Sequence, residues 1–131
     1  MSKLEKPMIR WYWEQVGGTL CEEFHAVPRS TRHARRLIDA VILPDGQRTA
    51  VHWRDLDLNG RDVVVVQAKA NRLGMYLMGQ ALFSARLLEQ RFSPKSVRSV
   101  ALCRTDDVIL RSLFEAIPGM EVVVVPAGSA V

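Results

Sequence analysis

A run of four consecutive valines, Val63–Val66, constrains the fold of this chain more than any other stretch. Such a run is too apolar for a strand with one face in water, so it predicts a central strand that is covered on both sides. The strand ends in Gln67 and Lys69, which point to the same face because side chains alternate along a strand. Polar side chains at the end of a buried strand mark a candidate site, although a strand that simply emerges into solvent also ends this way.

The other hydrophobic patterns predict a single α/β domain over residues 1–131, with residues 1–8 and 127–131 as loose tails. Apolar residues at helical spacing, among them Leu20 and Phe24, predict a first helix that runs through Gly17-Gly18 and ends before Pro28. We expect a mixed sheet with helices on both faces, in the order αβββαβαβ. The remaining predicted elements are strands at 37–43, 49–53, 62–69, 97–103 and 121–125, and helices at 74–92 and 106–116.

The composition and the cysteines indicate the class of protein and its compartment. With 48% hydrophobic and 24% charged residues, the chain is globular rather than disordered. No apolar run is long enough to cross a bilayer, and the N-terminus lacks the apolar core of a signal peptide. The two cysteines, Cys21 and Cys103, lack disulfide or metal spacing. We therefore expect a cytoplasmic protein without a membrane partner, whose thiols are free and mostly buried.

Basic residues gather in one segment of the chain. The net charge is +4, and the segment 29–36 holds four arginines, including Arg32, Arg35 and Arg36. Such a run indicates either a solvated loop or a surface for a polyanion such as DNA. Arg72, which follows the valine strand, is a further candidate for phosphate contacts.

Two acidic residues stand in apolar surroundings. On the predicted first helix, Glu23 lies close to the inward direction of Leu20, whereas Glu22 points away. Glu23 then either needs a buried partner or bends out to water or to an arginine. Asp39 is a lone acid inside the apolar strand 37–43. A carboxylate there is either a structural acid paired with an arginine or a ligand or catalytic group.

These polar groups converge if strands 37–43 and 62–69 are neighbours, because Asp39 then meets Gln67 and Lys69 at one edge of the sheet. Two carboxylates, an amide oxygen and a backbone carbonyl form an all-oxygen site, which suits Mg²⁺ or Mn²⁺. A metal ion there lowers the pKa of a bound water and offsets charge on a phosphodiester. Lys69 can orient that water or stabilise the transition state as a point charge.

Four features occur in this order along the chain: a helix, the segment Arg36-Leu-Ile-Asp39-Ala-Val-Ile, the segment Val66-Gln67-Ala-Lys69, and a helix bearing Gln80. This arrangement resembles the PD-(D/E)XK nuclease superfamily, of the restriction endonuclease-like fold, over roughly residues 10–103. The resemblance implies metal-dependent hydrolysis of DNA. It assigns Asp39 to the metal-binding aspartate, Gln67 to the following acidic position, Lys69 to the motif lysine, Glu23 to the acid of the first helix, and Gln80 to the glutamine that some branches carry on the helix after the lysine strand.

Gln67 departs from the motif, because an amide oxygen can ligate a metal but supplies no negative charge. Two main hypotheses follow. The first is a Mg²⁺- or Mn²⁺-dependent nuclease that selects DNA by shape, as a junction, end or flap, with a possible homodimer or protein partner aiding recognition. The second is a nuclease-like fold that no longer cleaves and that binds nucleic acid or a protein. An unrelated small α/β domain is a third, although no glycine-rich phosphate loop favours a nucleotide-binding one.

Overall fold

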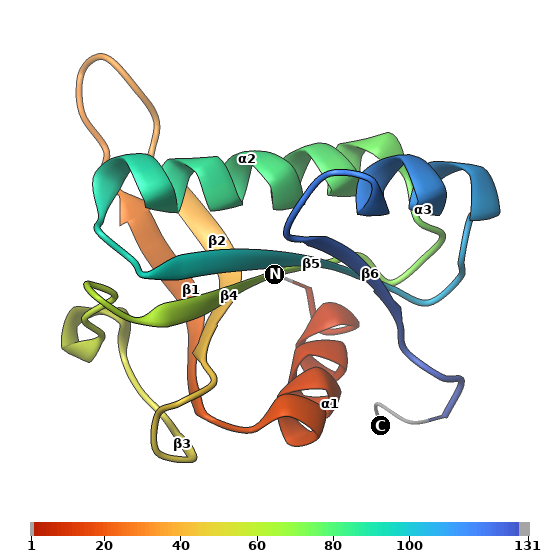
Figure 1. Cartoon of the computed structure of the whole chain (residues 1–131), viewed down its shortest axis with the longest axis horizontal. Helices are drawn as coiled ribbons and strands as arrows, with labels where there is room; N and C mark the ends of the chain where they lie inside the picture. Colours follow the sequence, from red (N-terminus) through yellow and green to blue (C-terminus); the bar gives the residue numbers. More distant parts are fainter. Residues whose placement is uncertain (1, 129–131) are drawn as a thin grey trace.

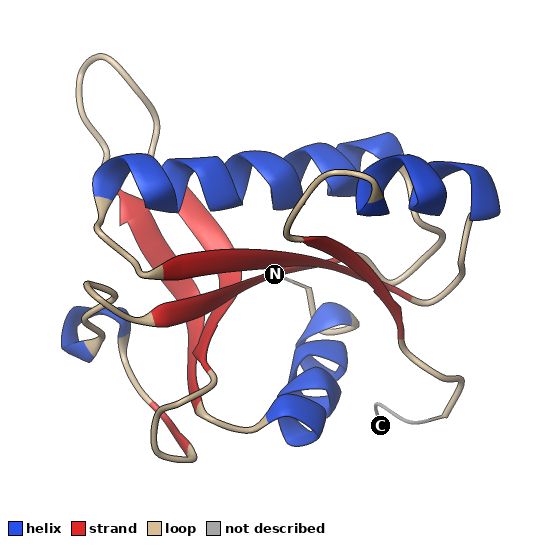
Figure 2. Ribbon diagram, viewed as in Figure 1, coloured by secondary structure: helices blue, strands red, loops and turns tan. Residues whose placement is uncertain are grey.

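The structure, a computed structural model, describes residues 2–128. A six-stranded mixed sheet carries one helix on one face and two helices on the other (Figures 1 and 2). The elements in chain order are α1 (Glu5–Val16), β1 (Thr19–Val27), β2 (Arg36–Leu43), β3 (Thr49–Ala50), a 3₁₀ turn (Trp53–Asp55), β4 (Asp62–Ala68), α2 (Met75–Arg91), β5 (Ser96–Cys103), α3 (Val108–Glu115) and β6 (Met120–Val124).

The strand order is β3-β1-β2-β4-β5-β6. Strand β4 pairs antiparallel with β2 and parallel with β5, which in turn pairs parallel with β6. Helix α1 covers one face, while α2 and α3 cover the other (Figure 1). The predicted mixed sheet with helices on both faces is thus confirmed. The predicted order αβββαβαβ is wrong, because four strands rather than three lie between the first two α-helices. Within residues 2–128, no helix is long and apolar enough to cross a membrane.

The valine strand is buried on both sides, as its composition predicts. Val64 and Val66 pack into the core beneath α1, with Ile9 among their neighbours. Val63 and Val65 point the other way, into a core that includes Leu88 of α2. All four valines are at most 1% exposed. The strand therefore forms the centre of a three-layer domain.

The predicted first helix is wrong at both ends. The helix begins at Glu5, inside the stretch expected to be a loose tail, and it ends at Val16. Gly17 and Gly18 then adopt φ values of 72° and 79°, which end the helix because other residues rarely adopt them. Residues 19–27, including the second half of the predicted helical stripe, form β1 instead. Of the predicted C-terminal tail, residues 129–131 lie outside the described part of the chain.

The predicted strand 49–53 is also wrong in length and partner. Only Thr49 and Ala50 form a strand, and they pair parallel with β1 rather than antiparallel with β2. Both edges of β2 are already occupied by β1 and β4, so the chain crosses to the far side of β1. The hydroxyl of Thr19 donates a hydrogen bond of 2.7 Å to the carbonyl of Gln47, which fixes this crossing.

Helix α2 packs closely on the sheet through small residues. Its buried positions are Leu77, Ala81, Ala85 and Leu88, whereas Met75 is 73% exposed. The Ser99 hydroxyl on β5 donates to the carbonyl of Ala81 at 2.7 Å. This contact and the alanines bring α2 close to β5, with Met75 turned to solvent and Met78 partly buried against the core.

The cysteines are free and buried, as predicted. Burial raises the pKa of the Cys21 thiol to about 12, and it also raises the pKa of Cys103. At neutral pH both thiols are therefore protonated and act as small apolar side chains.

Candidate functional site

Asp39 lies where β2 and β4 stop pairing. The last ladder pair is Ala40 with Val66, so Asp39 and Gln67 stand one residue beyond it. The Asp39 carboxylate accepts a hydrogen bond of 3.0 Å from the Ala68 backbone N–H. Burial raises the pKa of Asp39 and the nearby Glu5 carboxylate adds to the rise, whereas the Ala68 N–H and the Lys69 charge lower it. The group is a partly desolvated acid beside one like and one opposite charge.

An irregularity in both strands beside Asp39 explains where its carboxylate goes. On β2, Ile38 and Val41 belong to the same core although they are three positions apart. On β1, Cys21 and Phe24 do the same. Regular strands would place each pair on opposite faces, so both strands change face next to Asp39. The change directs the acid to the backbone of β4 rather than to the face that Gln67 occupies.

Gln67 is turned toward α2 and is 3% exposed. Its amide nitrogen donates to the Ser84 hydroxyl at 2.8 Å, and its oxygen accepts from the Asp39 backbone N–H at 3.4 Å. The nitrogen and the oxygen of the amide are therefore both hydrogen-bonded within the protein, so burying this polar side chain costs little free energy. The predicted meeting of Asp39 and Gln67 is found, but through the Asp39 backbone rather than its carboxylate.

Lys69 follows directly after β4 and is half-buried. Its backbone N–H donates to the Leu102 carbonyl at 3.0 Å, which fixes the chain. Its ammonium lies 5.5 Å from the centre of the Tyr76 ring on α2, a cation–π distance that restricts the flexible side chain. Tyr76, one helical turn before Gln80 on α2, therefore contributes to the site.

The predicted placement of Glu23 on the first helix is wrong. Glu23 is an exposed residue of β1 with φ of 52°, and it stands opposite Asp39, between the ladder pairs Glu22–Ala40 and Phe24–Ile38. Its neighbour Glu22 is the more buried of the two and pairs with Arg10 of α1. On α1, Glu5 is the acid whose charge acts on Asp39, and its carboxylate also accepts a hydrogen bond from the Ser2 backbone N–H at 3.4 Å. An acid in the first turn of a helix was the available signal, but the helix had to be placed correctly to use it.

We name Glu5, Asp39 and Lys69 the acidic corner. Within residues 2–128, no three His, Cys, Asp or Glu side chains lie together closely enough to hold a metal ion by themselves. Mg²⁺, however, is commonly bound by one or two carboxylates, with waters and substrate phosphates as its other ligands. Asp39 and Glu5, whose charges interact, are the two carboxylates available for that pattern, and the Gln67 amide is not needed as a ligand.

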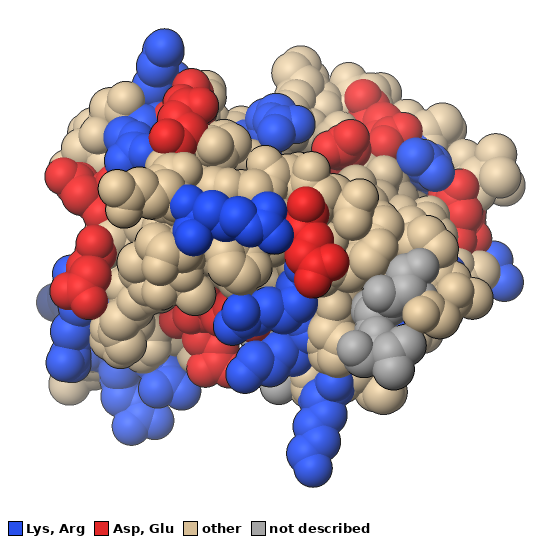
Figure 3. Space-filling view, turned by 90° about the horizontal axis from the view of Figure 1, so that it is seen from below, with Lys and Arg blue, Asp and Glu red and all other residues tan. Residues whose placement is uncertain are grey.

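The predicted DNA-binding residues fall into three places. Arg32 and Arg35 lie in the protruding 28–35 loop between β1 and β2, next to the end of α2 (Figure 1). Arg36 begins β2 and shares a groove with Gln80 of α2. Arg72 lies apart from them, in the β4–α2 loop, and donates to the Asp106 carbonyl at 2.9 Å. Figure 3, which views the α1 side, shows basic and acidic side chains interspersed.

Comparisons of this chain with protein-family models, with curated proteins and with solved structures return no match.

Proposed function

We propose that this chain is a metal-dependent nuclease that hydrolyses DNA phosphodiester bonds at the acidic corner, on a restriction endonuclease-like arrangement of strands. The observation that carries the proposal is the placement of Asp39. Its carboxylate is hydrogen-bonded to the Ala68 N–H within range of the charges of Lys69 and Glu5. A desolvated acid beside a lysine at the end of two buried strands is a costly arrangement, which is typical of functional sites.

Asp39 and Glu5 would hold the metal ion. Mg²⁺ or Mn²⁺ supplies a bound water with a lowered pKa and offsets negative charge on the scissile phosphate. The elevated pKa of Asp39 reflects an ionised form that lacks compensation, which a divalent cation provides. We therefore expect metal binding to be weak without DNA and stronger when phosphate oxygens complete the coordination.

Lys69 acts as a fixed positive charge. Its ammonium, restrained by the Tyr76 ring, stabilises the charge that develops on the phosphate during in-line attack by water. The exposed arginines of the 28–35 loop contact phosphates that flank the cleaved bond and make DNA binding dependent on salt.

A nuclease-like domain that binds DNA without cutting it is the second candidate. The internal hydrogen bonds of Gln67 favour it, because the position that carries a second acid in the resembled motif is here neutral and turned away. Such a domain keeps its DNA affinity when Asp39 is replaced by asparagine.

A second copy of the chain, or a protein partner, would contact the face that α2 and α3 share. Val108, Ile109 and Leu113 of α3 are between 61% and 79% exposed, and Met75 of α2 is 73% exposed. Exposed apolar side chains of this size commonly mark interaction surfaces. Sedimentation at high concentration tests the homodimer, and a monomer throughout the range contradicts it.

The test of the nuclease is cleavage of a DNA panel, comprising a junction, a flap, a blunt duplex and a single strand, in Mn²⁺ and in EDTA. The parent should cut at least one substrate in Mn²⁺ alone. Lys69→Ala should lower that rate by roughly 100- to 1,000-fold while keeping DNA affinity, because one transition-state contact is lost. Lys95→Ala, an exposed lysine outside the corner, is the control. A parent that binds DNA yet cuts none of the panel supports the second candidate instead.

A further inference from the structure

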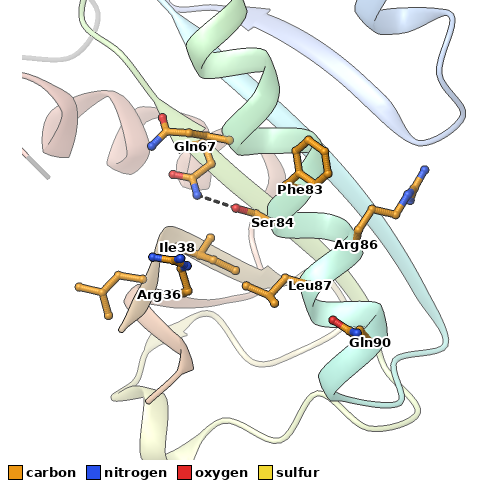
Figure 4. A pocket seen from close by; sticks show the side chains of 10 residues that line it. Arg36, Ile38, Gln67, Phe83, Ser84, Arg86, Leu87 and Gln90 are labelled. Atoms are coloured by element: carbon orange, nitrogen blue, oxygen red, sulfur yellow. Dashed lines mark hydrogen bonds between the residues drawn. The ribbon is translucent and has the colours of Figure 1, made fainter. Parts of the chain in front are cut away.

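A groove of about 620 Å³ runs along α2 beside the start of β2 (Figure 4). Phe83 and Leu87 of α2 and Leu37 and Ile38 of β2 give it apolar walls. The Phe83 side chain is 70% exposed and Leu37 is 38% exposed, so apolar surface faces solvent here. An exposed apolar groove of this kind is typical of a ligand site.

The charge of the groove is positive. Arg36 and Arg86 are among its lining residues, and none of the lining residues is acidic. Glu89 lies nearby and accepts from the Arg86 guanidinium at 2.9 Å, which neutralises one of the two charges. The Arg36 guanidinium makes no hydrogen bond or ion pair to any other described residue. The groove therefore suits an anion with a flat, apolar body.

The groove reaches the acidic corner through Gln67. This residue lines the groove, and its amide oxygen also accepts from the Asp39 backbone N–H at 3.4 Å. Figure 4 shows the Gln67 amide bonded to Ser84 at one end of the groove, with Arg36 and Leu87 farther along. Gln80, one helical turn before Ser84 on α2, lines the groove too. A ligand in the groove thus lies next to the strand end that presents Asp39.

We propose that the groove binds an unpaired nucleotide of a DNA strand, with its base against Phe83 and Leu87 and its phosphate at Arg36. An aromatic side chain accepts any base by stacking, and arginine binds the backbone. The amide of Gln80 can pair with a base edge, which is free only when the base is unpaired. This inference rests on the proposed function and narrows its substrate to DNA with single-stranded nucleotides beside the cut, such as a flap or a frayed end.

The test is binding of a short single strand that carries 2-aminopurine, whose fluorescence falls on stacking, measured in EDTA so that cleavage plays no part. We expect the parent to quench the probe and to bind it more tightly than a blunt duplex of the same length. Phe83→Ala should weaken single-strand binding by roughly 5- to 150-fold and abolish the quenching. Arg36→Ala should weaken binding and lower its salt dependence by about one counterion.

One substitution outside the groove is the control. Arg98→Ala removes an exposed arginine from β5, and it should leave quenching unchanged. Equal single-strand binding by parent and Phe83→Ala overturns the inference, as does a loss of dimer in Phe83→Ala without any change in quenching. A third outcome separates the two proposals. If the parent quenches the fluorescence of the probe and Phe83→Ala does not, but no substrate is cut in Mn²⁺, the groove binds a nucleotide and the nuclease proposal is wrong.

Discussion

The acidic corner and the groove along α2 meet at neighbouring residues of the same two strands, yet their chemistry is opposite. In the corner, Asp39 is partly desolvated, and burial raises its pKa because the charged form is short of compensation. In the groove, Gln67 is neutral, buried and bonded at both ends of its amide. The structure supports the Gln67 side chain fully and leaves the Asp39 carboxylate in an unfavourable state. We infer that Gln67 is chiefly a structural link, whereas Asp39 is maintained for chemistry.

The largest effect should come from Asp39→Asn. Cleavage should fall at least about 100-fold, because the metal and its charge stabilisation are lost. Stability should change in the opposite direction. Because the folded-state pKa of Asp39 is raised, ionisation destabilises the fold as pH rises from the usual aspartate range toward that pKa. Thermal melts should therefore show Asp39→Asn to be more stable than the parent at pH 7 but not at pH 3. A destabilised variant at pH 7 would mean that Asp39 is a structural acid.

Gln67→Glu places a second acid where the two regions meet. Without metal the variant should be less stable than the parent by about 1–3 kcal/mol, because a charge is buried at a 3% exposed position. The Ser84 hydroxyl can rotate to donate to the new carboxylate, so the fold should survive. Mn²⁺ should restore the stability in a thermal melt. The control is Gln90→Glu, an exposed change on the same helix. If Mn²⁺ leaves the melting temperature of Gln67→Glu unchanged, then residue 67 does not reach the metal ion, and the groove and the acidic corner are separate sites.

Glu5→Gln tests whether α1 belongs to the corner. We expect a loss of roughly 10- to 100-fold in Mn²⁺ affinity, with little change in DNA binding in EDTA. Glu14→Gln, exposed on the same helix, should behave as the parent does. Unchanged Mn²⁺ affinity in Glu5→Gln would restrict the corner to Asp39 and Lys69.

The smallest effect should come from Ser84→Ala, which removes the hydrogen bond to the Gln67 amide. A loss of about 0.5–1.5 kcal/mol in the free energy of unfolding is expected from denaturant titration. Ser112→Ala, on the exposed surface of α3, is the matched change and should cost less. A decrease in cleavage as large as that of Lys69→Ala would show that the groove takes part in the chemistry.

Sequence reasoning succeeded where a pattern depended on burial alone. The valine run identified the central strand, and the adjacency of β2 and β4 brought Asp39, Gln67 and Lys69 to one edge. It failed where the backbone conformation of single residues determines the structure. The spacing of Leu20 and Phe24 continued a helical stripe past Gly17, whose positive φ ends the helix, and so Glu23 was placed on a helix instead of on β1. The change of face beside Asp39 leaves no mark in the hydrophobic pattern, so the turning of Gln67 toward α2 could not be predicted.

Calorimetric titration of Mn²⁺ into the parent and into Asp39→Asn, each with an uncleavable phosphorothioate DNA present, tests the central claim most directly. We predict one bound ion per chain in the parent and no measurable binding in Asp39→Asn, with the DNA still bound by both. Equal Mn²⁺ binding by the two proteins, or none by either, would contradict the assignment of the acidic corner as a metal-dependent catalytic site.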